Sequence, residues 1–268
     1  MERGTVNKAA TPPALGAATM AEAFAITVRE DGDRVALRTR GGELELTWGE
    51  YGSRVDRLAL GLRALGVGRG DIVALMLDNR PEFHIADSAC ISLGATPFSL
   101  YQTLTADQIA HQLEDSGAEV AIVESKFLER VLEAAERIPA LRHVVLVDGD
   151  AVPDGVHSFT DLLESEGDPA EIAAAREAVE PEDLLTLIYT SGTTGPPKGV
   201  QITHSNMMTS VQALQDSIEI PQWSRVISYL PMAHIAERAT GHYLPIVLGH
   251  TVTTCPNPRE VMAYLPEV

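Results

Sequence analysis

Short apolar runs alternate with longer amphipathic segments along most of the chain. The runs have the length of strands, and the segments between them carry apolar residues at helical spacing. Strands are predicted at 35–39, 43–46, 72–77, 95–99, 120–123, 143–147, 184–189 and 200–203. Strands without polar alternation are typical of parallel sheets that helices cover on both faces. The pattern therefore predicts a layered α/β fold of mostly parallel sheets flanked by helices.

Signals for helix boundaries support this alternation. Thr47 with Glu50, and Thr105 with Gln108, have the spacing of a capping box, in which two side chains satisfy backbone groups at a helix start. Glycines that can end a helix follow the predicted helices at Gly66, Gly94 and Gly117.

Changes in composition divide the chain into four segments. Residues 1–18 are predicted to be a loose tail, and residues 19–150 a first α/β portion. Residues 151–183 contain ten acidic residues and one basic residue, so we expect a solvated helical connection, with an acidic docking patch as the alternative. Residues 184–268 return to the alternation of strands and helices and form a second α/β portion.

Charge and composition narrow the class of partner. The chain has 38 acidic and 20 basic residues, a net charge of −18, which disfavours nucleic acid and anionic membrane surfaces. Two cysteines are too few for a disulfide framework or a zinc site, and they fit a reducing cytoplasm. A charge-free stretch, 239–258, contains glycines, prolines and histidines. We therefore predict a buried helix, a turn and a strand there, and no membrane span.

One segment concentrates the candidate chemistry. The apolar strand at 184–189 runs into a loop, 190–199, that contains three glycines, four hydroxyl residues and one lysine. Glycines let backbone N–H groups face a ligand, the hydroxyls add donors, and Lys198 adds a positive charge. Such donors at the carboxyl end of a strand predict a phosphate site. Composition alone is also typical of a surface hairpin rich in glycine and hydroxyl residues.

The loop differs from the phosphate loop of P-loop NTPases. That loop ends in Gly-Lys-Ser/Thr and continues into a helix. Here Pro197 precedes Lys198, Gly199 follows it, and 200–203 predicts a strand. A kinase or a GTPase is therefore disfavoured.

Residues 190–199, Thr-Ser-Gly-Thr-Thr-Gly-Pro-Pro-Lys-Gly, resemble the signature loop of the acyl-adenylate-forming superfamily. This superfamily includes acyl-CoA synthetases, adenylation domains of peptide synthetases and firefly luciferase. The flanking segment 201–206 shares the resemblance, and residues 228–238, Ser-Tyr-Leu-Pro-Met-Ala-His-Ile-Ala-Glu-Arg, resemble long-chain fatty acyl-CoA synthetases. The resemblance implies that ATP and a fatty acid form an acyl-adenylate, which CoA then converts to a thioester.

The resemblance also implies roles for individual residues. The loop would hold the β- and γ-phosphates of ATP, with Thr190 near a Mg²⁺ ion. His234 would lie beside the carboxyl group of the acyl-adenylate, although a histidine at a helix start is often without chemistry. The residues implied for ATP and phosphate binding are Thr190, Ser191, Gly192, Thr193, Thr194, Gly195 and Lys198.

Other polar residues are expected to be structural. Glu237 and Arg238 are predicted to form a pair on the surface. His84 and Asp87 lie on a predicted helix, and His204 begins another, so none of the three requires a function.

The resemblance covers only part of the superfamily's pattern. The segments that bind adenine, ribose and the metal, and a lid domain with a catalytic lysine, are not found in this sequence. We therefore expect an incomplete N-terminal domain of the adenylate-forming fold that is inactive by itself and forms homo-oligomers through surfaces exposed by truncation. Alternatives to the CoA ligase are an enzyme that loads a carrier protein, including a fatty acyl-AMP ligase, and a non-catalytic fragment that binds a nucleotide or a partner.

Overall fold

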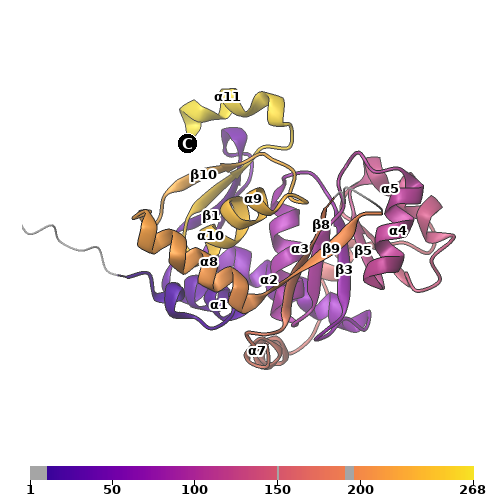
Figure 1. The fold of residues 1–268 in the computed structure, drawn as a ribbon, viewed down its shortest axis with the longest axis horizontal. Coiled ribbons are helices and arrows are strands. Elements are labelled where there is room, and N and C mark those ends of the chain that lie inside the picture. Colours follow the sequence, from indigo (N-terminus) through magenta and orange to yellow (C-terminus); the bar gives the residue numbers. More distant parts are fainter. Residues whose placement is uncertain (1–10, 150, 191–195) are drawn as a thin grey trace, which may run out of the picture.

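The computed structural model describes residues 11–149, 151–190 and 196–268, which form two sheets with helices packed around them (Figure 1). The larger sheet has the strand order β7-β6-β5-β3-β4-β8-β9, and the smaller has the order β10-β11-β1-β2. The strands are β1 (Val35–Thr39), β2 (Glu45–Thr47), β3 (Ile72–Met76), β4 (Thr96–Ser99), β5 (Val120–Val123), β6 (His143–Leu146), β7 (His157–Ser158), β8 (Leu184–Thr190), β9 (Lys198–Thr203), β10 (Arg225–Ser228) and β11 (Thr251–Thr254). The α-helices are α1 (Met20–Glu30), α2 (Trp48–Ala64), α3 (Pro81–Ser92), α4 (Ala106–Ser116), α5 (Ser125–Ala135), α6 (Phe159–Leu163), α7 (Pro169–Glu177), α8 (His204–Ser217), α9 (Ile235–Glu237), α10 (Leu244–Leu248) and α11 (Val261–Tyr264).

The larger sheet confirms the predicted parallel architecture. Every neighbouring pair from β7 to β8 is parallel, and only β8 and β9 are antiparallel. Successive residues of β3 enter opposite cores: Val73 and Leu75 pack with α2 and α3, whereas Ala74 and Met76 pack with α4 and α5. Because both faces are buried, the strand has no polar alternation.

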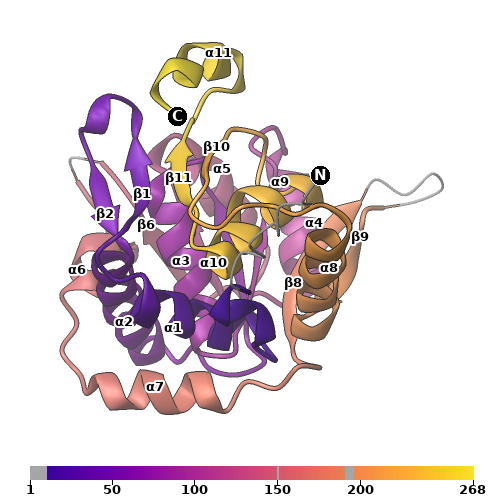
Figure 2. The ribbon, with the colours of Figure 1, turned by 90° about the vertical axis from the view of Figure 1, so that its left-hand side faces the viewer.

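The smaller sheet joins the beginning and the end of the chain. β1 pairs with β11 in parallel, with Leu37 opposite Val252, and Figure 2 shows the two strands side by side. β2 returns antiparallel to β1 and confirms the predicted hairpin. The predicted charge-free helix, turn and strand correspond to α10, Gly249 in a left-handed conformation, and β11. No helix in the described ranges is both long and apolar enough to span a membrane.

Both predicted capping boxes are present. The side chains of Thr47 and Glu50 bond the backbone at the start of α2, and those of Thr105 and Gln108 do so at the start of α4. Gly117 ends α4 with φ of 71°, a conformation that residues with a Cβ rarely adopt. Local chemistry therefore fixes these helix ends.

Two predictions about the connecting segments need correction. Of the predicted loose tail, residues 1–10 lie outside the described part, but Pro13–Gly16 form a 3₁₀-helix with Leu15 buried. The acidic connection also packs against the fold: β7 adds a strand to the larger sheet, and Phe159 and Ile172 are buried. Nine of the ten acidic residues of the connection are exposed, so its apolar residues face the fold while its charges face solvent.

Candidate functional site

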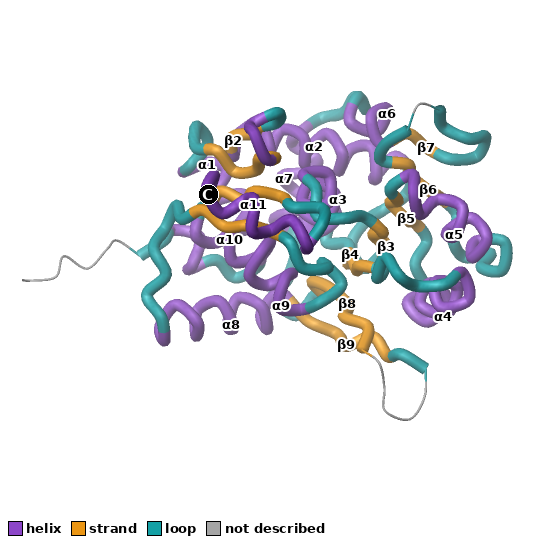
Figure 3. Tube along the Cα trace, turned by 90° about the horizontal axis from the view of Figure 1, so that it is seen from above, coloured by secondary structure: helices purple, strands orange, loops and turns teal. Residues whose placement is uncertain are grey.

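The predicted phosphate loop connects the antiparallel strands β8 and β9. Thr190 ends β8 and Lys198 begins β9, and the two residues pair in register and are exposed. Figure 3 shows these strands extending from the body of the molecule. Ser191, Gly192, Thr193, Thr194 and Gly195 lie outside the described residues. The structure therefore brings a hydroxyl and an ammonium side chain together at the base of the loop.

Helix α4 supports both strands below the loop. The Tyr189 hydroxyl donates to Asp115 Oδ2 at 2.8 Å, and burial raises the pKa of this phenol, so it remains a donor. A Cβ on Gly199 would lie 3.2 Å from the Tyr189 ring, so the glycine lets β9 lie close to that ring. His111, also on α4, donates from Nε2 to the Pro197 carbonyl at 3.3 Å. These contacts fix the positions of the two strands that hold Thr190 and Lys198.

His234 caps helix α9, as the sequence predicts. Its Nδ1 accepts a hydrogen bond from the Ala236 backbone N–H at 3.2 Å, and the residue is exposed. Because Nδ1 is an acceptor here, the neutral ring carries its proton on Nε2. The ring can therefore donate one hydrogen bond to a ligand while it caps the helix.

The prediction that Glu237 and Arg238 form a surface pair is wrong. Both residues are buried and they bind different partners. The Arg238 guanidinium forms an ion pair with Asp87 and donates to Ser99 Oγ at 2.7 Å and to the Pro97 carbonyl at 3.1 Å. Ser99 and Pro97 belong to β4, the neighbour of β8. The segment after His234 is thus tied to the sheet that carries the predicted loop.

Two histidines continue this buried network. His242 Nε2 donates to Asp87 Oδ1 at 3.0 Å, and His84 Nδ1 lies 2.9 Å from His242 Nδ1. Burial opposes the ionisation of Asp87, but Arg238 and His242 outweigh it and hold the pKa of this carboxyl below its ordinary value. Burial holds the pKa of His84 well below its usual range. His84 and Asp87 therefore have structural partners, as expected, although their helix alone did not reveal them.

A signal in the sequence could have indicated this network. Asp87 is the one charged residue between Phe83 and Leu93, in a helix that is buried all round. Charged residues are rarely buried unless they are paired, so an acid in such a helix implies a cation from elsewhere in the chain. Identifying Arg238 as that cation requires the tertiary structure.

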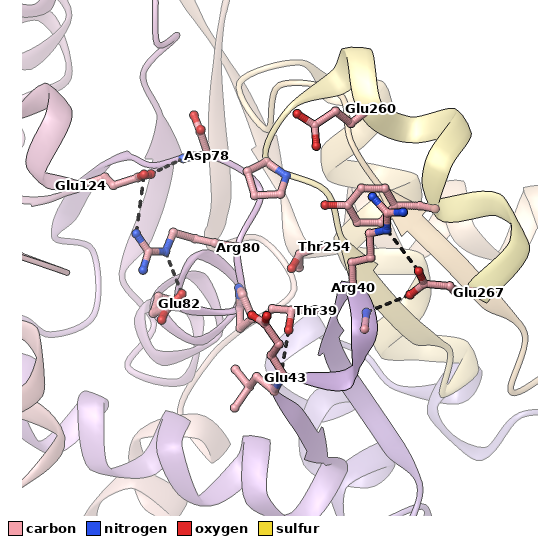
Figure 4. A pocket seen from close by; sticks show the side chains of 15 residues that line it. Thr39, Arg40, Glu43, Asp78, Arg80, Glu82, Glu124, Thr254, Glu260 and Glu267 are labelled. Carbon is pink, nitrogen blue, oxygen red and sulfur yellow. Dashed lines mark hydrogen bonds and ion pairs between the residues drawn. The ribbon is translucent and has the colours of Figure 1, made fainter.

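The described residues also enclose a cavity of about 580 Å³, and Figure 4 shows the side chains that line it. It is lined by residues that follow β1, β3, β5 and β11, but not by Thr190, Lys198 or His234. Its two arginines are engaged: Arg80 bonds Glu82 at 2.8 Å and Asp148 at 2.7 Å, and Arg40 bonds Glu267 at 3.1 Å. Its lining carries six carboxylates and two arginines, so it does not resemble a phosphate site.

The described residues contain no cluster of three His, Cys, Asp or Glu side chains that could hold a metal ion. Thr190 contributes one exposed hydroxyl oxygen at the end of β8. Mg²⁺ is commonly held by one or two protein oxygens together with water and the phosphates of a nucleotide. The donor set is therefore compatible with a nucleotide-bound ion and not with a cage built from protein ligands.

Comparisons with known proteins show the family of the chain. The family described as AMP-binding enzyme matches residues 24–267. The chain belongs to this family. Among the relatives of the chain, long-chain-fatty-acid–CoA ligase FadD15 of Mycobacterium bovis is 35% identical over 216 residues, which cover 79% of this chain and 36% of the relative. Peroxisomal long chain acyl-CoA synthetase 7 of Arabidopsis thaliana is 34% identical over 234 residues, which cover 83% of this chain and 32% of the relative.

A solved structure shows the same fold. The N-terminal domain of FACL13 from Mycobacterium tuberculosis superposes with a TM-score of 0.79 at 25% identity, covering 93% of this chain and 60% of that chain. The chain spans about a third of the length of these two relatives. The predicted α/β class and its relation to the N-terminal part of adenylate-forming enzymes are confirmed.

Proposed function

We propose that this chain is the N-terminal part of a long-chain fatty acid–CoA ligase. Such an enzyme joins a fatty acid to the α-phosphate of ATP with release of pyrophosphate, and CoA then displaces AMP to form a thioester. The observation that carries the proposal is the ten-residue loop at 190–199 at the end of β8, in a chain whose family is AMP-binding enzyme. The relatives named as fatty acid–CoA ligases support the choice of acid.

The first step is limited by charge repulsion. A carboxylate must attack the α-phosphate of a polyanion, and a chain with a net charge of −18 adds to the unfavourable potential. Catalysis by positioning and electrostatic stabilisation therefore needs local donors. Lys198 supplies a cation, and the hydroxyls and backbone N–H groups of the loop supply hydrogen bonds to the β- and γ-phosphates.

Thr190 and His234 have different roles in this proposal. Thr190 Oγ1 is the protein oxygen that would contact a Mg²⁺ ion bound to the phosphates, and such an ion neutralises their charge. His234 donates from Nε2 to the carboxyl group of the acyl-adenylate, because its Nδ1 already caps α9. We also propose a cytoplasmic location, since Cys90 and Cys255 are buried free thiols.

Two measurements test the function. Calorimetry on the 268-residue chain with ATP and Mg²⁺ should give binding that inorganic pyrophosphate displaces. The protein at its natural full length should then form a fatty acyl thioester with CoA in an ATP-dependent reaction. Transfer of the acyl group to a carrier protein but not to CoA would support the carrier-loading enzyme instead of the CoA ligase. Nucleotide binding without adenylate formation would support a non-catalytic binding protein.

A further inference from the structure

The short helix after His234 is anchored on two sides. Glu237 and Arg238 are consecutive, and they are 3% and 0% exposed. Glu237 contacts the loop after β3 and the segment after β10, whereas Arg238 contacts α3 and β4. Burying two charged groups costs free energy unless each has good partners. These partners therefore define how α9 is held.

Glu237 and Asn79 fix the connection between β10 and α9. Asn79 Nδ2 donates to Ser228 Oγ and to the Leu230 carbonyl, both at 2.8 Å, and lies 3.4 Å from Glu237 Oε1. The same Oε1 accepts the backbone N–H of Tyr229 at 3.1 Å. One amide and one carboxylate thus hold three consecutive residues of the connection that leads to His234.

The helix that follows leaves room for the Glu237 carboxylate. Residues Arg238–Tyr243 form a π-helix, a local widening that is often found at functional sites. A Cβ on Gly241 would lie 2.4 Å from Glu237 Oε1 and 3.4 Å from Ser228 Oγ. Only glycine at this position lets the carboxylate reach the connection without displacement.

Arg238 connects the same helix to the strand that carries the predicted loop. Its guanidinium donates to the Pro97 carbonyl on β4, and the Thr186 hydroxyl of β8 donates to that same carbonyl at 2.7 Å. β4 and β8 pair directly through Phe98 and Leu187. The two anchors therefore hold His234 in a fixed relation to the end of β8, where Thr190 lies.

We propose that Glu237 and Asn79 are positioning residues that set the orientation of the His234 ring toward the bound acyl group. Neither side chain is exposed enough to contact the substrate itself. They act through the connection at 229–234 and the cap of α9. The effect on catalysis rests on the proposed function, because it requires that His234 contacts the acyl-adenylate, whereas the anchoring does not.

Amide hydrogen exchange on the 268-residue chain tests the anchoring. The variants are Glu237→Ala, Asn79→Ala and the conservative Glu237→Gln, which keeps an acceptor oxygen at Oε1. The matched control is Glu219→Ala, because Glu219 is an exposed carboxylate in the segment between α8 and β10. We expect the two alanine variants to exchange the amides at 229–236 at least about tenfold faster than the unsubstituted chain, because local opening becomes easier. The exchange rates of the amides of β5 should not change. In Glu237→Gln the exchange rates at 229–236 should lie within about threefold of those in the unsubstituted chain.

Steady-state kinetics of fatty-acid-dependent ATP–pyrophosphate exchange, with the protein at its natural full length, test the positioning. Glu237→Ala should raise KM for the fatty acid about fivefold or more and lower kcat, with KM for ATP within about twofold, because the phosphate loop is not touched. Glu237→Gln should recover most of the activity, and Glu219→Ala should match the unsubstituted protein. An equal loss of kcat/KM for the fatty acid and for ATP would indicate general destabilisation of the protein, and it would overturn the positioning role.

The two measurements separate the inference from the proposed function. Unchanged exchange at 229–236 in both alanine variants would overturn the anchoring, whatever the activity. Faster exchange with unchanged kinetics for the fatty acid would overturn the catalytic consequence of the anchoring. Absence of pyrophosphate exchange in the unsubstituted protein would contradict the proposed function, and amide exchange would still decide the anchoring.

Discussion

Lys198 is one of three lysines in the chain, and it begins β9 at the base of the predicted phosphate loop. In the protein at its natural full length, we expect Lys198→Ala to lower kcat/KM for ATP about ten- to hundredfold, since a hydrogen bond to a charged group contributes about 1.5–3 kcal/mol. KM for the fatty acid should change less than about twofold, because a phosphate contact is lost and not an acyl contact. Lys126→Ala is the matched control, because Lys126 pairs with Asp78 and Glu124 instead. An unchanged kcat/KM for ATP would remove Lys198 from the site.

Gly241 provides a second test at the scale of one residue. Alanine is the better helix former by about 1 kcal/mol, so Gly241→Ala would stabilise an ordinary helix. Here the added Cβ displaces the Glu237 carboxylate and leaves buried donors without a partner, which costs about 1–3 kcal/mol. We expect a net loss of about 1 kcal/mol in the free energy of unfolding, measured in urea. Gly16→Ala, where a Cβ meets no atom within 4 Å, should change stability by less than about 0.5 kcal/mol. Stabilisation by Gly241→Ala would show that Glu237 is not held there.

The site residues differ in how far the sequence could predict them. Thr190 and Lys198 belong to one local motif, so the sequence predicts both of them together. Asp87 and Arg238 are 151 positions apart, and Asn79 and Ser228 are 149 positions apart. No local pattern relates such pairs, and for that reason the prediction of a surface pair at Glu237 and Arg238 is wrong.

At the scale of elements, local signals were sufficient for most boundaries. The strand at 120–123 and the capping boxes of α2 and α4 are present as predicted because apolar runs and caps act within a few residues. The sequence does not predict β7, because this strand consists of a histidine and a serine that pair with β6 without an apolar run. The pairing of β1 with β11 was also beyond the sequence, because it joins strands more than 200 residues apart.

The packing of α8 against α1 gives stability a dependence on pH. His204 begins α8, and its Nδ1 accepts the Met20 backbone N–H at the start of α1, at 3.1 Å. Burial lowers the pKa of His204 to about 4, against the attraction of the Asp183 and Asp87 carboxylates. Below the ordinary value of about 6.5 the unfolded chain takes up a proton and the native state does not, so stability falls as the pH falls toward 4.

We therefore expect the contribution of His204 to the free energy of unfolding to fall by about 2 kcal/mol when the pH is lowered from 7 to 5. His204→Asn places an amide oxygen near Nδ1 and cannot titrate. The difference in the free energy of unfolding between the unsubstituted chain and this variant, measured in urea at the two pH values, should change by that amount in favour of the variant at pH 5. If this difference in the free energy of unfolding were the same at pH 7 and pH 5, it would contradict the lowered pKa of His204.

At the scale of the whole molecule, the exposed strand edges predict association. β9 and β10 are edge strands among the described strands, and Val200 on β9 is 48% exposed. Near the last residue, Met262 is 72% exposed and Leu265 53%. Open edges and apolar patches favour pairing with another chain. Light scattering on the 268-residue chain should therefore give a mass above 28.8 kDa, and Val200→Lys should shift it toward that value. A monomer at crystallisation concentration would contradict this prediction.

Activity of the 268 residues by themselves is the last test of the whole molecule. The resemblance assigns phosphate binding to a loop that includes Thr190 and Lys198, and it assigns the groups for adenine, ribose, the metal and the lid to segments not found in this sequence. Groups that act together lose most of their effect when several are absent, because positioning is lost with them. We expect fatty-acid-dependent ATP–pyrophosphate exchange at least about a hundredfold below that of the relative FadD15 assayed at the same enzyme concentration. Exchange within about tenfold of the relative would show that the essential groups lie within these 268 residues and that the assignment of the others is wrong.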